Sequence, residues 1–143
     1  MLIGIDPGVA TGYAEWDRQA GGFLAIKSMP IHLAMLRVQE HMTAGRIEGV
    51  AWEDARLRTW FGTKGAEALQ GAGSIKRDCT IWSDYLAHLK CPRRAVKPQA
   101  GATKWDADTF RRVTGWPGRT NEHGRDAALL VWRLEHWIPE ARK

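Results

Sequence analysis

Carboxylates and a histidine occur at three separated points of the chain, each beside an apolar segment. Asp6 follows the apolar run 2–5, and Glu53 ends a second apolar run. His123 and Asp126 are three residues apart, a spacing that places both on one face of a helix. Cleavage of a phosphodiester by two divalent cations needs such a set, because hard cations prefer oxygen ligands and the two ions lie about 4 Å apart. The pattern predicts a two-metal site.

Each of these residues also has an ordinary structural explanation. Asp6 precedes a proline and can be a turn residue, Asp126 can be an acidic residue in an early helical turn, and His123 can be a polar helix residue. Asp54 is a rival of Glu53, because side chains alternate along a strand and only one of the two can point toward Asp6. The combination, more than any one member, therefore supports the site.

The first half of the chain predicts the strands that position these acids. Segment 2–5 is a buried strand that turns at Asp6-Pro7-Gly8, and 11–16 and 23–29 follow it as an antiparallel meander. A helix then opens at Pro30 and ends near Gly45, and its apolar side consists of Leu33, Leu36 and Met42. A fourth strand over 47–53 follows this helix, so we expect it beside the first strand and parallel to it.

The second half predicts one long helix and three shorter elements. The long helix covers 66–90, and its apolar stripe is Leu69, Ala72, Ile75, Cys79, Trp82, Leu86 and Leu89. The shorter elements are a strand over 93–96, a helix over 104–113 after a loop at 98–102, and a final helix. Thr120 or Asn121 caps the final helix, whose stripe is Ala127, Leu130, Val131, Leu134 and Trp137. We therefore expect one α/β domain over 1–143, with a five-stranded mixed sheet flanked by helices.

The composition favours a polyanionic partner. Lys and Arg number 21 against 16 Asp and Glu, which gives a net charge of +5 and favours nucleic acid over an anionic membrane. The apolar runs are far shorter than the roughly 20 residues needed to cross a bilayer, and no signal peptide opens the chain. We expect a soluble, cytoplasmic protein in which Cys79 and Cys91 are reduced thiols.

A basic and aromatic loop is the strongest candidate for DNA contact. It spans 54–65 and shows no helical or strand periodicity. Its candidate residues are Arg56, Arg58, Trp60, Phe61 and Lys64, and Arg77 can also hold a phosphate, although a solvated surface charge is the simpler explanation for each arginine. The long helix can present part of its stripe to a second subunit, with core packing as the alternative.

Three motifs, in order along the chain, resemble the RuvC-type Holliday-junction resolvases of the RNase H-like nuclease superfamily. The segment 3–12, Ile-Gly-Ile-Asp-Pro-Gly-Val-Ala-Thr-Gly, resembles the opening motif of that family. Val50-Ala-Trp-Glu53 resembles its second motif, and His123-Gly-Arg-Asp126-Ala-Ala-Leu its closing motif. Leu69-Gln-Gly-Ala-Gly73 is similar to the start of its long helix, and Lys97 and Lys104 resemble its basic positions near the scissile phosphate.

The resemblance implies an RNase H-like fold and an endonuclease that cuts four-way DNA junctions by paired symmetric nicks. Asp6 then bridges two Mg²⁺ ions, or Mn²⁺ ions, and Glu53 and Asp126 bind one ion each. His123 is a ligand or a proton-transfer group, and Lys104 counters charge on the phosphate. It also implies a homodimer, through the long helix, in a bacterial or phage-infected bacterial cell.

The chain departs from the family pattern at two places. The segment 96–104 looks shortened, and Arg56 stands where the family has an aromatic residue that helps to open the junction. Trp60 or Phe61 can take over that wedge role or can anchor the loop to the core. Alternatives are a related nuclease for flaps, forks or structured RNA, and a binding-only RNase H-like module. An actin-like or sugar-kinase ATPase needs two such domains, which 143 residues do not provide.

Overall fold

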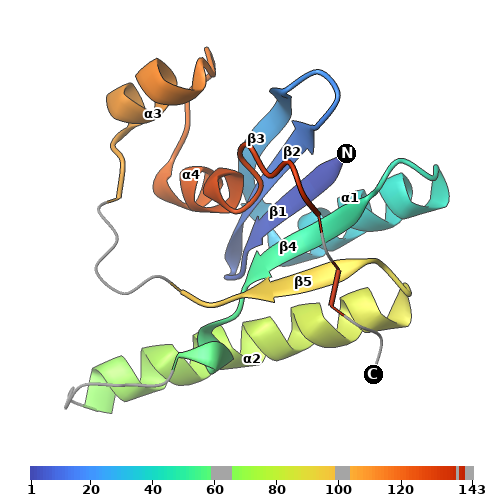
Figure 1. Cartoon of the computed structure of the whole chain (residues 1–143). Helices are drawn as coiled ribbons and strands as arrows, with labels where there is room; N and C mark the ends of the chain where they lie inside the picture. The colour runs from blue at the N-terminus through green and yellow to red at the C-terminus, as the bar shows by residue number, and fades with distance from the viewer. Residues whose placement is uncertain (59–65, 99–103, 138, 141–143) are drawn as a thin grey trace.

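A five-stranded mixed sheet forms the centre of the computed structural model (Figure 1). The structure describes residues 1–58, 66–98, 104–137 and 139–140. The strands are β1 (Leu2–Asp6), β2 (Ala10–Asp17), β3 (Gly22–Pro30), β4 (Gly49–Glu53) and β5 (Arg93–Val96). In the order β3-β2-β1-β4-β5, the first three strands form an antiparallel meander, while β4 runs parallel to β1 and β5 parallel to β4. The predicted sheet is confirmed, including the parallel placement of β4 beside β1.

Helices cover both faces of this sheet. They are α1 (Ile31–Thr43), the 3-10 turn η1 (Ala55–Leu57), α2 (Ala66–His88), α3 (Ala107–Thr114) and α4 (Glu122–Leu129). The core cluster on one face joins the sheet to α1 and α2, and the cluster on the other face joins it to α3 and α4. Figure 1 shows α2 and α4 on opposite sides of β4 and β1. In the described part of the chain, no helix is long and apolar enough to cross a membrane.

Side-chain alternation along β1 and β4 decides which residues face α4. Ile3 and Ile5 of β1 belong to the α1–α2 cluster, whereas Leu2 belongs to the α4 cluster. Along β4, Trp52 lies on the α1–α2 side and Ala51 on the α4 side. Asp6 lies on the same side of β1 as Leu2 and Gly4, and Glu53 lies on the same side of β4 as Ala51, so the two acids share the face that α4 covers.

Glycines bring α4 unusually close to this face. A Cβ on Gly4 would lie 2.0 Å from the carbonyl oxygen of Ala127, and a Cβ on Gly12 would lie 2.0 Å from that of His123. No side chain fits at either position while α4 stays in place. The backbone of α4 therefore rests directly on β1 and β2, and this contact sets the height of α4 above the sheet.

The buried side of α1 differs from the predicted one. Leu33 and Leu36 are exposed, at 45% and 52%, and Ala34, Val38 and His41 are buried instead. The reason is a buried polar cluster centred on Glu15 of β2, which lies on this face of the sheet. The Glu15 Oε1 atom is 2.8 Å from Nε2 of His41, and it accepts hydrogen bonds from Tyr13 (2.9 Å) and Arg37 (3.0 Å). The helix turns His41 and Arg37 toward Glu15, which rotates the two leucines outward.

The final helix is shorter than predicted. Asn121 caps α4 by accepting from the backbone N–H of Gly124, and the helix ends at Leu129. Leu130, Val131, Leu134 and Trp137 still belong to the core on this face, but from a turn and the irregular segment that follows it. Arg133 has a positive φ of 54°, which is incompatible with a continuous right-handed helix. The helix prediction was therefore wrong beyond 129, although its apolar residues are in the core.

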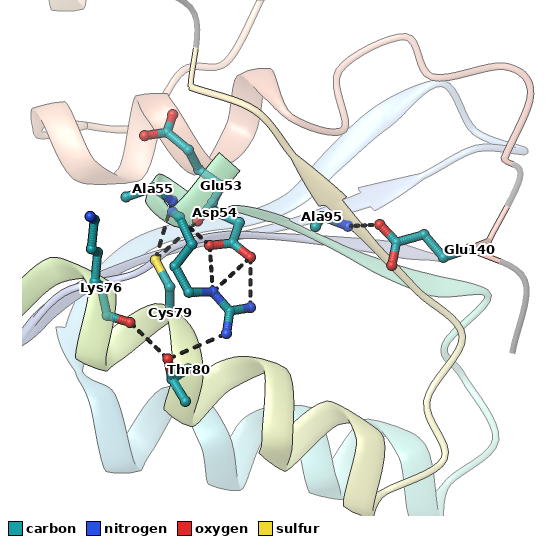
Figure 2. Close-up of polar contacts among 9 residues, drawn as sticks. Glu53, Asp54, Ala55, Lys76, Cys79, Thr80, Ala95 and Glu140 are labelled. Carbon is teal, nitrogen blue, oxygen red and sulfur yellow. Dashed lines mark hydrogen bonds and ion pairs between the residues drawn. The ribbon is translucent and has the colours of Figure 1, made fainter. Parts of the chain in front are cut away.

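Two smaller features complete the fold. The helix predicted over 104–113 begins later, at Ala107, because Asp106 caps it by accepting from the backbone N–H of Thr109. Near the C-terminus, Glu140 lies against the edge strand β5, where its Oε1 accepts from the N–H of Ala95 at 2.9 Å (Figure 2). Its own N–H donates to the carbonyl of Arg93. This segment therefore covers polar groups at one edge of the sheet.

Candidate metal centre

The candidate site lies where β1 and β4 end beside the first turn of α4. Ile5 pairs with Trp52 in the parallel ladder, so Asp6 and Glu53 follow at the same level of two neighbouring strands. His123, at the start of α4, has its Nδ1 3.0 Å from Oδ2 of Asp6. Residues 117 positions apart in sequence are thus joined directly.

Electrostatic interactions show that the acids form one group. Burial raises the pKa of Glu53, and the negative charges of Asp6 and Asp126 raise it further. Burial also raises the pKa of Asp6, where the hydrogen bond with His123 opposes the rise and the charge of Asp126 adds to it. Ionisation of Asp6 and of Glu53 is therefore costly because of burial and of the neighbouring acids. A cation placed among them would relieve this cost.

Lys104 supplies the positive charge nearest to Asp126. Its Nζ lies 3.1 Å from Oδ2 of Asp126 and also pairs with Glu122. The hydrogen bonds that Lys104 donates to Glu122 and Asp126 raise the pKa of Lys104 well above its ordinary value, so the side chain is an ammonium at neutral pH. A fixed positive charge thus borders the acidic group, as expected of a lysine that faces a phosphate.

Glu53 and not Asp54 belongs to this group. Asp54 is only 2% exposed and turns to the opposite side of the sheet, where its carboxylate binds the guanidinium of Arg56 (Figure 2). Burial raises the pKa of Asp54, but the hydrogen bonds and charge of Arg56 outweigh that effect and lower it overall. The structure thereby separates the two neighbouring acids, since Asp54 pairs with Arg56 on the α2 side and Glu53 faces the side of Asp6.

The donor chemistry of the site fits a hard divalent cation. Asp6, Glu53 and Asp126 offer carboxylate oxygens and His123 an imidazole nitrogen, which are ligands that Mg²⁺ and Mn²⁺ accept. Among the described residues, no three His, Cys, Asp or Glu side chains are arranged closely enough to enclose an ion as they stand. One oxygen of Asp6 instead contacts His123, and one oxygen of Asp126 accepts from Lys104. Metal binding would therefore require these contacts to rearrange.

The residues predicted to contact DNA fall into three groups. Arg58 is exposed next to the site, and its charge lowers the pKa of Glu53. Lys97, directly after β5, and Arg77 on α2 are also exposed, and Arg77 lies 3.5 Å from Asp78. Arg56 is held by Asp54. Trp60, Phe61 and Lys64 lie outside the described residues. For all seven of these residues, a contact with DNA stays a prediction.

Three contributors to the site were absent from the sequence-based set. Glu122 binds Lys104, Gly12 admits the backbone of α4, and Cys79 of α2 contacts the backbone around Glu53. Glu122 directly precedes His123, and Gly12 closes the first motif, so both stood beside residues already singled out. Cys79 had no such signal, because its place in an apolar stripe indicates only core packing.

Comparison with known proteins identifies the fold. No protein-family model and no curated protein sequence matches the chain. Among solved structures, the chain is similar to T. thermophilus RuvC in complex with a Holliday junction substrate. The two are 20% identical, the match covers 92% of this chain and 89% of that chain, and the TM-score is 0.55. The five-stranded mixed sheet and its flanking helices thus have the RNase H-like fold of that protein.

Proposed function

We propose that this chain is a divalent-metal-dependent endonuclease that cuts four-way DNA junctions. The observation that supports it best is the convergence of Asp6, Glu53, His123 and Asp126 at one edge of the sheet, in an RNase H-like fold. The fold alone does not specify an activity, since one fold carries many functions. The argument therefore rests on the acids and on their mutual electrostatic cost.

Each residue of the site has a defined task in this proposal. Asp6, Glu53 and Asp126 would hold two Mg²⁺ or Mn²⁺ ions, with Asp6 shared between them and Glu53 and Asp126 each serving one. When bound, the pair of ions supplies an activated water and stabilises the leaving 3′ oxygen. His123 holds Asp6 through Nδ1, and Nε2 remains as the second ring nitrogen for a ligand bond or for proton transfer. Lys104 brings its ammonium to the phosphate from its place beside Asp126.

The preference for a four-way junction is supported by the solved relative, whose structure contains a Holliday junction. Paired, symmetric nicks need two sites, so a homodimer is part of the proposal. The long helix α2 is its candidate interface, because the apolar stripe extends past the core. Cys79, Trp82 and Leu86 of this stripe are buried, whereas Ile75 is 47% exposed.

The test compares substrates that share sequence and length but differ in shape. A four-way junction, a fork, a flap, a structured RNA and a linear duplex are incubated with the chain, each with Mg²⁺ and with EDTA. We expect Mg²⁺-dependent cleavage of the junction at two symmetric positions and little cleavage of the linear duplex. Faster cutting of flaps, forks or RNA would assign the alternative nuclease activity, and equal cutting of linear duplex would exclude junction resolution.

The Asp6→Asn variant separates catalysis from binding. We expect it to bind the junction and to cleave it at least about 100-fold more slowly, because even the outer partners of metal ligands contribute 10–100-fold. A D6N chain that cuts as fast as wild type would disprove the metal mechanism. A wild-type chain that binds junctions and cuts none of the substrates would indicate a binding-only module.

A further inference from the structure

Arg56 forms an ion pair with Asp54 at the point where the chain leaves β4. Its Nε lies 2.9 Å and 3.1 Å from the two carboxylate oxygens of Asp54, and its Nη2 lies 2.7 Å from Oδ2 (Figure 2). The backbone N–H of Arg56 donates to the same carboxylate at 3.0 Å, so Asp54 also caps η1. A forked, charge-assisted contact of this kind has a fixed geometry.

The Arg56 side chain of this ion pair also contacts α2. Nη1 of Arg56 donates to Oγ1 of Thr80 at 3.3 Å. One residue earlier on α2, the buried thiol of Cys79 accepts from the backbone N–H of Ala55 at 3.4 Å and contacts the carbonyl oxygen of Glu53 at 3.6 Å. The backbone on either side of Asp54 and the side chain of Asp54 itself are therefore all tied to one turn of α2 (Figure 2).

This attachment acts together with the β-ladder, in which Glu53 pairs with Val96 and the Asp54 N–H donates to the Val96 carbonyl at 2.8 Å, to fix where Glu53 points. Adjacent residues at a strand end face opposite sides, so a side chain held toward α2 at Asp54 directs Glu53 toward α4 and Asp6. Glu53 needs such a restraint, because it is a half-buried carboxylate that the negative charges of Asp6 and Asp126 repel. Without a tether, a rotation of this strand end would move the carboxylate out toward solvent and relieve the repulsion.

We infer that Arg56 is a positioning residue of the metal centre: by holding Asp54 against α2, it keeps the carboxylate of Glu53 turned toward Asp6. The inference rests on the proposed function and adds to it a residue that does not touch the metal or the DNA. It also gives a physical reason for an arginine at a position where the resolvases carry an aromatic residue. Here the side chain turns back onto its own strand end.

The first measurement is metal affinity in the absence of DNA. Mn²⁺ is titrated calorimetrically into the full chain as wild type, Arg56→Ala and Arg56→Lys, at a temperature where circular dichroism shows all three folded. We expect R56A to bind Mn²⁺ about 10-fold more weakly, as for other residues that orient metal ligands. R56K should lie between, because an ammonium can pair with Asp54 but cannot form the fork. Glu140→Ala, which removes a side-chain contact to β5 instead, is the matched control and should bind as wild type.

A double-mutant cycle shows whether the effect passes through Glu53. In a Glu53→Gln background, the positioned carboxylate is gone, so adding R56A should change Mn²⁺ affinity less than about twofold. An undiminished 10-fold loss in that background would overturn the inference. So would an R56A chain that binds Mn²⁺ normally and instead loses junction affinity in EDTA, which would make Arg56 a DNA contact.

The outcome for wild type separates this inference from the proposed function. A wild-type chain that binds no Mn²⁺ overturns both. Binding by wild type that R56A leaves unchanged overturns only the positioning role. In the cleavage assay, the expected signature of R56A is a higher Mg²⁺ requirement with a largely restored rate at saturating Mg²⁺.

Discussion

Single residues of the site combine a function with a cost to the fold. Asp6 and Glu53 are largely buried near each other, and the pKa of each is raised by burial and by neighbouring acids. A raised pKa in the folded state means that ionisation at neutral pH destabilises the folded chain. The site therefore stores electrostatic strain that a bound cation would release.

The Glu53→Gln variant tests this cost. Glu53 has a folded-state pKa above the ordinary 4.5, so its contribution to stability is present below pH 4.5 and is lost as pH rises through the folded pKa. At pH 7 in EDTA, E53Q should melt a few degrees above wild type, while junction cleavage falls at least about 100-fold. The two melting temperatures should converge below pH 4.5. A lower melting temperature for E53Q at pH 7 would contradict the electrostatic account.

Added Mg²⁺ should reverse the order of stability. Wild type gains stability from the bound ion and E53Q gains less, because a ligand stabilises only the form that binds it. The measurement is thermal unfolding at pH 7 with increasing Mg²⁺. Parallel shifts in both proteins would indicate that Glu53 is not a ligand.

At the residue scale, sequence reasoning singled out the acids that the structure brings together, but not the residues that hold them in place. Asp6, Glu53, His123 and Asp126 carry recognisable chemistry at recognisable spacing. The choice between Glu53 and Asp54 needed the structure, because alternation says only that they diverge and not which one faces α4. The sequence indicated a phosphate contact for Arg56, which stays a prediction, but it gave no sign that the guanidinium pairs with Asp54, two residues earlier in the chain.

At the scale of elements, the seating of α4 on two glycines controls the geometry of the site. Gly12→Ala would place a methyl group 2.0 Å from the carbonyl oxygen of His123 and 2.9 Å from Cβ of Asp6. We expect α4 to shift outward, with a loss of about 1–3 kcal/mol in unfolding free energy and weaker Mn²⁺ binding. Gly22→Ala is the control, since no atom lies within 4 Å of its added Cβ. Wild-type metal affinity in G12A would show that the site does not depend on the close packing of α4 against Gly12.

The buried cluster around Glu15 attaches α1 to the opposite face of the sheet. Burial raises the pKa of Glu15, but hydrogen bonds from His41 and Tyr13 and the charges of His41 and Arg37 outweigh burial and lower it overall. Its stabilising contribution is therefore present above pH 4.5 and is lost as pH falls through the folded pKa.

Glu15→Gln should lower the free energy of unfolding at pH 7 by about 3 kcal/mol, because it leaves buried partners without their counter-charge. Urea unfolding at pH 7 and at lower pH measures this, and the difference from wild type should shrink as wild-type Glu15 becomes protonated. Glu40→Gln, on the exposed side of α1, is the control. A difference that stays constant below pH 4.5 would show that the charge of Glu15 is unimportant.

Element prediction succeeded where hydrophobic patterns were unambiguous. All five strands were placed, and α2 was predicted from its stripe. It failed for the orientation of α1, since Leu33 and Leu36 form a plausible apolar side and no periodicity rule anticipates a buried Glu15–His41 pair. It also failed beyond Leu129, where a helical stripe continues in sequence but a positive φ at Arg133 bends the chain. Both failures arise from tertiary contacts that outweigh local pattern.

At the scale of the whole molecule, the projecting part of α2 is the candidate contact between two copies. Ile75→Asp places a charge on the exposed end of the apolar stripe. We expect a monomer by analytical ultracentrifugation and a junction product with single, unpaired nicks. Leu24→Asp, at an exposed leucine of β3, is the control and should leave the mass unchanged. An I75D chain that keeps the mass and paired cuts of wild type would place any dimer contact elsewhere.

The ligands of the candidate site come from opposite ends of the chain, and this has a consequence for its synthesis. Asp6 and Glu53 emerge early, whereas His123 and Asp126 emerge about 70 residues after Glu53 and must then dock on the two glycines. A nascent or truncated chain therefore lacks half of the ligands that cleavage would require. If the site is a nuclease, the order of translation itself keeps it inert until the last helix is in place, and a chain ending at Arg119 should fold its sheet less stably and cut nothing.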